Sequence, residues 1–144
     1  MLNHETLLNN EEESKNFAKI LAQKLSAGSV VLFTGDLGSG KTFLCREIIK
    51  YFCGSNTEII SPTFNILQTY QATNFMIYHF DLYRLKSSEE IYELGIEDAL
   101  QGNLCLIEWP EIIEHLLPEP LVRINLQITL NNKRRCVTLP DIAT

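Results

Sequence analysis

The segment Gly35-Asp36-Leu37-Gly38-Ser39-Gly40-Lys41-Thr42 sets the fold class expected of this chain. The apolar run Val30-Val31-Leu32-Phe33 precedes it, as in a strand buried on both faces, and apolar residues at helical spacing follow it. The glycines let successive backbone N–H groups point at an anion without obstruction by Cβ atoms, and the following helix adds its N-terminal amides. The spacing G-x-x-x-x-G-K-[ST] in this setting predicts a phosphate-binding loop, or P-loop.

Two side chains of the P-loop have distinct expected roles. We expect Lys41 to bring its ammonium to the β- and γ-phosphates of a nucleotide, and the Thr42 hydroxyl to bind Mg²⁺. The residues expected to contact the nucleotide are Asp36, Leu37, Gly38, Ser39, Gly40, Lys41, Thr42 and Phe43. The stretch Asn132-Lys133-Arg134-Arg135 lacks the aspartate of a guanine-specific Asn-Lys-x-Asp element, so ATP is favoured over GTP.

The rest of the chain alternates helical and strand-like patterns. Strands are expected at residues 29–34, 65–70, 75–82, 104–107, 121–130 and 135–139, and helices or helical turns at 11–28, 41–54 and 87–100. The second and third of these strands are expected to form an antiparallel hairpin, and so are the last two. We therefore predict a single P-loop NTPase-like α/β domain over residues 1–144, with a mixed parallel and antiparallel sheet flanked by helices.

Composition excludes several classes of protein. The 144 residues are 45% hydrophobic and 21% charged, which is ordinary for a folded domain, and no apolar run approaches the roughly 20 residues of a membrane span. The polar, acidic residues 1–13 do not resemble a secretory signal, so a cytoplasmic location is expected. The net charge of −6 argues against autonomous nucleic-acid binding. The four cysteines lack a Cys-x-x-Cys pair, which argues against a zinc site, and we interpret them as small packing residues.

Two carboxylates follow apolar strand-like runs, as a P-loop needs for Mg²⁺ or its waters. Glu108 comes after residues 104–107, and Asp81 ends the strand-like segment before it. Both are predicted to act at the metal or at the attacking water, and their spacing leaves open which one ligates the metal directly. Thr63, held beside Pro62, is a candidate sensor of the γ-phosphate or of Mg²⁺, with an ordinary turn as the alternative.

Three neighbouring side chains each have two interpretations. His79 alternates with apolar residues, so we interpret it as a hydrogen-bonded structural histidine rather than a catalytic base. Arg84 either faces a phosphate or pairs with a nearby acid. Trp109 either packs in the core or covers the site beside Glu108.

With these residues assembled, the chain resembles the TsaE family, also called YjeE, whose members are P-loop ATPases of bacterial tRNA threonylcarbamoyladenosine synthesis. The resemblance covers nearly the whole chain. Four motifs carry it in the same order: Gly35–Thr42, Ser61-Pro62-Thr63-Phe64, His79-Phe80-Asp81-Leu82-Tyr83-Arg84-Leu85 and Ile107-Glu108-Trp109-Pro110. Ser39 stands where alanine is common in the family, and Phe43 replaces a frequent second threonine.

The resemblance implies ATP and Mg²⁺ as cofactors. Thr42 and Glu108 would attend the Mg²⁺, with Asp81 assisting the metal or the attacking water. The catalytic residues are then expected to be Lys41, Thr63, Asp81 and Glu108. The resemblance further places the adenine near Glu11 and Lys133.

The resemblance also implies protein partners, TsaD and TsaB, with tRNA reached only through their complex. The expected activity is a Mg-dependent ATPase, weak alone and stimulated by these partners, that supports repeated modification of adenosine 37. Two alternatives remain open from the sequence: a small-molecule P-loop kinase, and a nucleotide-dependent interaction module without significant hydrolysis. The acidic segment after Ser87 counts against the arginine-rich lid of a kinase.

Overall fold

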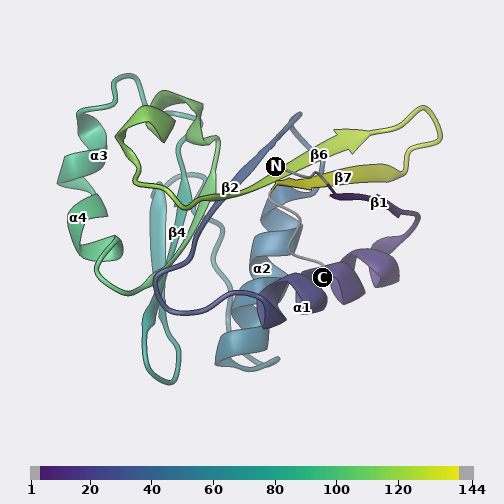
Figure 1. Ribbon diagram of the computed structural model, residues 1–144, viewed down its shortest axis with the longest axis horizontal. Coiled ribbons are helices and arrows are strands. Elements are labelled where there is room, and N and C mark those ends of the chain that lie inside the picture. The colour runs from purple at the N-terminus through teal and green to yellow at the C-terminus, as the bar shows by residue number, and fades with distance from the viewer. Residues whose placement is uncertain (1–3, 140–144) are drawn as a thin grey trace.

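A mixed sheet lies at the centre of the structure, between two groups of helices (Figure 1). The computed structural model describes residues 4–139. Within this part of the chain the strands are β1 (His4–Leu8), β2 (Val30–Gly35), β3 (Leu67–Gln71), β4 (Met76–Asp81), β5 (Leu104–Glu108), β6 (Val122–Ile128) and β7 (Arg134–Leu139). Their order across the sheet is β1-β7-β6-β2-β5-β4-β3. Strands β6, β2, β5 and β4 are parallel, while β7, β1 and β3 are antiparallel to their neighbours, so the prediction of a mixed α/β sheet is confirmed.

Strand β2 shows why the central sheet residues are apolar throughout. Val31 and Phe33 pack into the core beneath helices α1 (Glu11–Gln23) and α2 (Lys41–Cys53). Val30 and Leu32 point to the opposite face and belong to a second core. A strand covered on both sides buries every side chain, which explains the unbroken apolar run in the sequence.

The second core is closed by short helical segments rather than by long helices. These are α3 (Glu90–Glu93), α4 (Ile96–Ala99), η1 (Pro110–Ile112) and η2 (Glu114–Leu116). Gly95 lies between α3 and α4 with φ 83°, so the helical turns expected at residues 87–100 are two short helices. No helix in residues 4–139 is long and apolar enough to cross a membrane.

Helix α1 begins as expected and ends earlier than expected. The side chain of Asn10 accepts a hydrogen bond from the N–H of Glu13 at 2.9 Å and so caps the helix at its expected start. The helix ends at Gln23 instead of near Gly28. The chain then turns toward the sheet, and the Gly28 N–H donates to the carbonyl of Asn103 before β5, so a tertiary contact moves the boundary.

Strand β1 was not expected from the sequence. Its five residues pair antiparallel with β7 at one edge of the sheet, which places the start of α1 beside the β6–β7 hairpin (Figure 1).

The four cysteines are free thiols; Cys45, Cys105 and Cys136 are buried and Cys53 is partly buried, as their interpretation as packing residues predicts.

Candidate nucleotide and metal site

The P-loop begins where β2 ends and continues into α2. Gly35 and Gly40 have φ angles of 133° and 108°, in a region that residues with a Cβ avoid. At Gly35, a Cβ would also lie 2.1 Å from the carbonyl oxygen of Leu126 on β6. The N–H groups of Lys41 and Thr42 lie in the first turn of α2, where a helix offers them no acceptor. The local backbone therefore directs amide donors toward an anion site.

The ammonium of Lys41 is held against the P-loop. Its Nζ donates hydrogen bonds to the carbonyl oxygens of Gly35 at 2.5 Å and Asp36 at 3.0 Å, and it lies 4.0 Å from the centre of the Trp109 ring. Burial lowers the pKa of Lys41, while the negative charge of Glu108 raises it. Phosphate oxygens would compete with the carbonyls of Gly35 and Asp36 for the Lys41 ammonium, which these contacts already hold at the P-loop.

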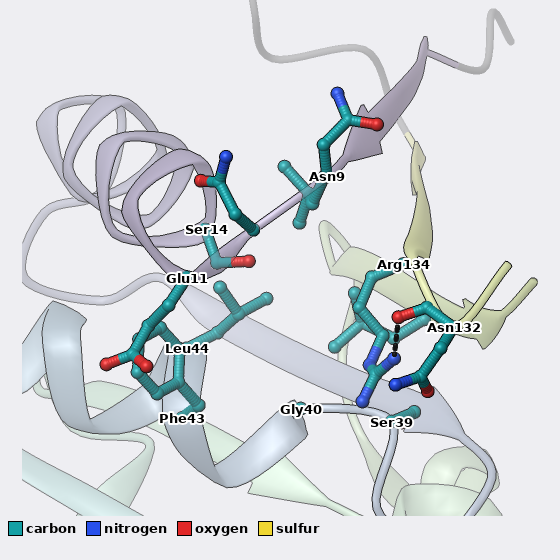
Figure 2. Close-up of a pocket in the computed structure, with 12 residues that line it drawn as sticks. Asn9, Glu11, Ser14, Ser39, Gly40, Phe43, Leu44, Asn132 and Arg134 are labelled. Carbon is teal, nitrogen blue, oxygen red and sulfur yellow. Dashed lines mark hydrogen bonds between the residues drawn. The ribbon is translucent and has the colours of Figure 1, made fainter.

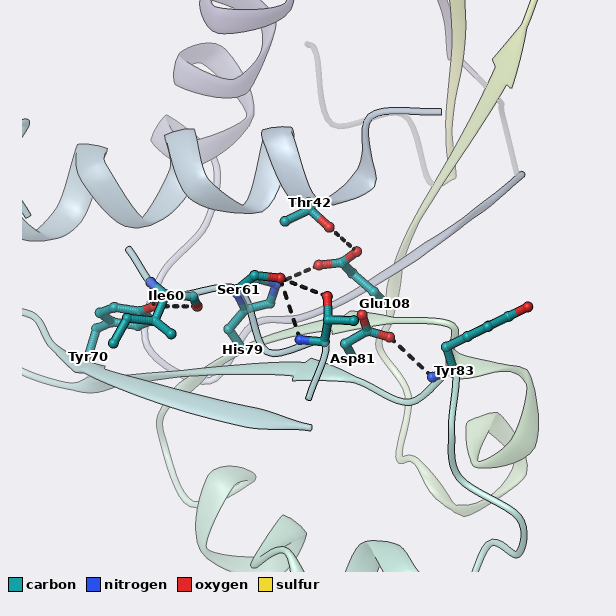
Figure 3. Close-up of polar contacts among 9 residues, drawn as sticks. Thr42, Ile60, Ser61, Tyr70, His79, Asp81, Tyr83 and Glu108 are labelled. Atoms are coloured by element: carbon teal, nitrogen blue, oxygen red, sulfur yellow. Dashed lines mark hydrogen bonds and ion pairs between the residues drawn. The ribbon is translucent and has the colours of Figure 1, made fainter. Parts of the chain in front are cut away.

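Glu108 joins the P-loop helix to the neighbouring strand. The Thr42 hydroxyl donates to Oε1 of Glu108 at 2.7 Å, and the other carboxylate oxygen is 2.6 Å from Nε2 of His79 (Figure 3). Glu108 is only 2% exposed and His79 is fully buried, so the contact between these two side chains is shielded from water. The expectation that His79 is hydrogen-bonded is thereby confirmed.

The two predicted acids come together because of strand register. In the parallel pair β4–β5, Asp81 lies opposite Glu108, and in the pair β2–β5, Phe33 lies opposite Glu108. Both carboxylates consequently stand at the carboxyl edge of the sheet, beside the start of the P-loop. This edge is where α/β sheets of this kind bind ligands.

Asp81 and Thr63 complete the same cavity. A cavity of about 270 Å³ is lined by Thr42, Thr63, Asp81 and Glu108 together with Lys41 and P-loop residues. Burial raises the pKa of Asp81, and the hydrogen bond from the Tyr83 N–H at 3.1 Å opposes that rise. The structure thus brings together all four residues expected to be catalytic.

The oxygen atoms in this cavity suit a hard divalent cation. Mg²⁺ takes oxygen ligands and is usually held by one or two carboxylates together with waters and substrate phosphates. The Thr42 hydroxyl and the Glu108 carboxylate are already in contact, and Asp81 lies on the adjacent strand. These residues therefore fit Mg²⁺, with Thr42 and Glu108 as the closest pair.

A second cavity, of about 290 Å³, lies on the other side of the P-loop. Figure 2 shows Glu11 and Phe43 on one side of it, and Asn132 and Arg134 on the other. Glu11 was expected in this region, whereas Lys133 is not among the lining residues although both of its neighbours are. Gly40 and Phe43 line both cavities, so the start of α2 lies between them.

Arg134 also lines the second cavity, although its sequence context did not mark it as a site residue. One guanidinium nitrogen donates to the carbonyl of Gly38 at 3.3 Å, and another donates to the carbonyl of Asn132 at 3.1 Å. Strand β7 is thereby connected to the P-loop across the second cavity. The one sequence feature that distinguishes Arg134 is its position just after the hairpin turn. Nothing in the sequence indicates that this turn reaches the P-loop.

The structure shows what Trp109 and Arg84 contact. Trp109 has φ 57° and places its ring beside the Lys41 ammonium and 4.8 Å from the Tyr83 ring, so it lines the site while it also packs against the second core. The guanidinium of Arg84 lies 4.7 Å from the centre of the exposed Phe64 ring, not in the phosphate cavity. This contact with Phe64 was not among the two predicted from the sequence, a phosphate or a nearby acid.

The strand–P-loop–helix unit and the two carboxylates at neighbouring strand ends define a protein with a P-loop NTPase-like fold. Residues 8–137 match the family model described as threonylcarbamoyl adenosine biosynthesis protein TsaE. The chain belongs to the TsaE family.

Individual relatives agree with this assignment. The chain is 67% identical over 136 residues to a tRNA threonylcarbamoyladenosine biosynthesis protein TsaE from Rickettsia bellii, which covers 94% of each chain. It is 39% identical to the protein of the same name from Haemophilus influenzae over 114 residues, covering 78% of this chain and 72% of the relative. The crystal structure of Bacillus subtilis YdiB superposes with a TM-score of 0.78 at 28% identity, covering 95% of this chain and 84% of that one.

Proposed function

We propose that this chain binds Mg·ATP and hydrolyses it, acting as a nucleotide-driven switch on a TsaD–TsaB complex in the cytoplasm during synthesis of threonylcarbamoyladenosine at adenosine 37 of tRNA. One observation carries the proposal: Thr42 donates to Glu108 at 2.7 Å in a cavity that Lys41 and Asp81 also line. The family name and the printed names of the relatives support the role in tRNA modification.

The phosphate cavity supplies positioning and charge, which are the main requirements of phosphoryl transfer. Lys41 stabilises negative charge on the terminal phosphates, and the P-loop amides hold them in register with the strand-end acids. Bound Mg²⁺ would neutralise charge on the phosphate oxygens. Asp81 accepts a backbone hydrogen bond from Tyr83, which fixes its carboxylate where a nucleophilic water can be oriented.

The second cavity suits the nucleoside. Its wall contains the Phe43 ring, the Glu11 carboxylate and the polar side chains of Asn132 and Arg134, a mixture able to bind a flat heterocycle and a ribose. Because Gly40 and Phe43 line both cavities, a nucleotide could extend from one to the other along the start of α2. In this proposal Lys133 contributes through the hairpin backbone, since its neighbours line the cavity.

Dependence on a partner follows from the charges around the phosphate cavity. Lys41 is the only lysine or arginine among its described lining residues. P-loop hydrolases that turn over quickly add an arginine to the transferring phosphate, in the same chain or from a partner. We therefore expect slow turnover by the isolated chain and faster turnover when TsaD and TsaB are present. The same scarcity of cations counts against a kinase with an arginine-rich lid.

The test measures nucleotide uptake and turnover in matched variants. Lys41→Ala is expected to abolish Mg·ATP binding in calorimetry, whereas Lys50→Ala, a later lysine of α2 paired with Glu47, leaves binding intact. Glu108→Ala is expected to abolish turnover, whereas Glu97→Ala on the exposed side of α4 does not.

Adding TsaD and TsaB separates the proposed function from its alternatives. If the partners changed neither ATP turnover nor tRNA modification, the switch would be wrong. ADP release that required a small-molecule acceptor would instead identify a kinase. Complex formation that was equal with ATP and a nonhydrolysable analogue, without turnover, would identify a binding module.

A further inference from the structure

A second group of potential metal ligands lies behind the phosphate cavity. The thiol of Cys45 on α2, a ring nitrogen of His79 on β4 and a carboxylate oxygen of Glu108 on β5 all lie within 4.8 Å of one another. Cys45 and His79 are fully buried, and Glu108 is 2% exposed. The proposed ATPase mechanism uses Glu108 but leaves the thiol and the imidazole without a chemical role.

Packing alone does not explain this combination of side chains. Nδ1 of the buried His79 has no hydrogen-bond partner among the described residues, although buried polar atoms are nearly always paired. Nε2 is the nitrogen that faces the cluster, because it lies 2.6 Å from the Glu108 carboxylate, so an ion shared with Glu108 would bind Nε2 and not the unpaired Nδ1. Cys45 could be replaced by a small apolar residue if it only filled space, whereas a thiol, an imidazole and a carboxylate are the three side-chain types that bind zinc.

We propose that Cys45, His79 and Glu108 bind a transition-metal ion of zinc type beside the phosphate cavity, which Glu108 alone of the three also lines. A tetrahedral ion with bonds of about 2.0–2.3 Å needs ligand atoms roughly 3.3–3.8 Å apart. The 2.6 Å contact between His79 and Glu108 opens by about 1 Å to meet this requirement. Three protein ligands leave a fourth position for water, which is the arrangement of an open zinc site.

Access to this site runs through Glu108. Its carboxylate lines the phosphate cavity together with Thr42, while Cys45 lies three residues further along α2 and therefore on the same face of the helix. An ion that arrives from the cavity can meet the carboxylate first and then the thiol and imidazole. Cysteine spacing gave no indication of such a site, because its ligands come from three separate elements.

The site discriminates between metals by ligand softness. Mg²⁺ requires oxygen ligands and would use the side of Glu108 that faces Thr42, whereas a thiolate selects softer ions. Both ions draw on the same carboxylate, so they compete. Zn²⁺ is therefore expected to inhibit Mg-dependent hydrolysis by occupying Glu108, an expectation that rests on the proposed ATPase function.

Cobalt provides the direct test, because Co²⁺ replaces Zn²⁺ and reports its ligands by absorption. The whole chain is titrated with Co²⁺ without nucleotide, and we expect one bound ion with a thiolate charge-transfer band and the intense visible bands of tetrahedral cobalt. Cys45→Ser keeps the side chain's size, removes the band and weakens binding by at least about 100-fold, more than loss of an outer-shell partner typically costs. Cys105→Ser, which alters another fully buried thiol, retains the band and the affinity.

Each result of this experiment decides the proposal. A wild-type complex without the charge-transfer band overturns the site, even if Cys45→Ser fails to fold, and so does equal Co²⁺ affinity in wild type and Cys45→Ser. In turnover assays, Zn²⁺ is expected to inhibit wild type and Cys105→Ser more strongly than Cys45→Ser. A chain that binds Co²⁺ through the thiol but hydrolyses no ATP would keep the metal site and refute the proposed function.

Discussion

Replacing Gly35 by alanine tests the geometry on which the P-loop depends. The added Cβ would lie 2.1 Å from the Leu126 carbonyl oxygen, its partner in the β2–β6 register, and a normal contact of about 3.5 Å requires these strands to separate by more than about 1 Å. The φ angle of 133° adds strain of about 1–3 kcal/mol, and overpacking adds about 1–3 kcal/mol. We therefore expect Gly35→Ala to lower the free energy of unfolding by about 2–6 kcal/mol.

Gly28→Ala separates backbone strain from steric overlap. Gly28 has φ 92°, and a Cβ there would meet no atom within 4 Å, so only the strain of about 1–3 kcal/mol is expected. Urea unfolding followed by circular dichroism gives both free energies, and calorimetry shows whether each variant still binds Mg·ATP. Gly35→Ala should lose more stability than Gly28→Ala and should also lose the nucleotide. Equal losses of stability in the two variants would refute the reasoning from the β2–β6 contact.

Three further predictions concern single side chains of the site. Glu108→Gln keeps the size of the side chain and removes its charge, so ATP turnover in a steady-state assay should fall about 10²–10⁴-fold while nucleotide still binds; unchanged turnover would contradict its role. Burial raises the folded-state pKa of Asp81, so its ionised form destabilises the fold above that pKa. Asp81→Asn should therefore raise the free energy of unfolding at neutral pH, and the gain should vanish in urea titrations as pH falls below the ordinary value of 3.8. Trp109 is the only tryptophan, and the centre of its ring is 4.0 Å from the Lys41 ammonium. Mg·ATP should therefore change the tryptophan fluorescence of wild type but not of Lys41→Ala. An equal change in both would show that the cation contact is not the cause.

The residues that the sequence identified share a local signal. Glycines at fixed spacing, followed by Lys41 and Thr42, specify a backbone turn and a helix start within eight residues. Asp81 and Glu108 each follow an apolar strand, and parallel strands bring their carboxyl ends to one edge of the sheet. These features were predictable because neighbours along the chain determine them.

Other contributions to the site depend on segments far apart in the sequence. Arg134 reaches Gly38 across 96 positions because β7 pairs with β6, which pairs with β2. The edge strand β1 was missed because its residues alternate polar and apolar character too weakly to mark a strand, and its pairing with β7 places Glu11 beside the second cavity. No local pattern encodes such a pairing.

The sequence by itself determined the P-loop, the order of the main helices and strands after β1, and the acids at the strand ends, since each rests on the conformational preferences of a few consecutive residues. Only the tertiary structure decided that His79 bonds to Glu108, that Cys45 lies beside both and that Trp109 covers Lys41. The physical reason is that buried side chains from separate strands and helices are brought into contact by register and packing, which depend on the whole fold.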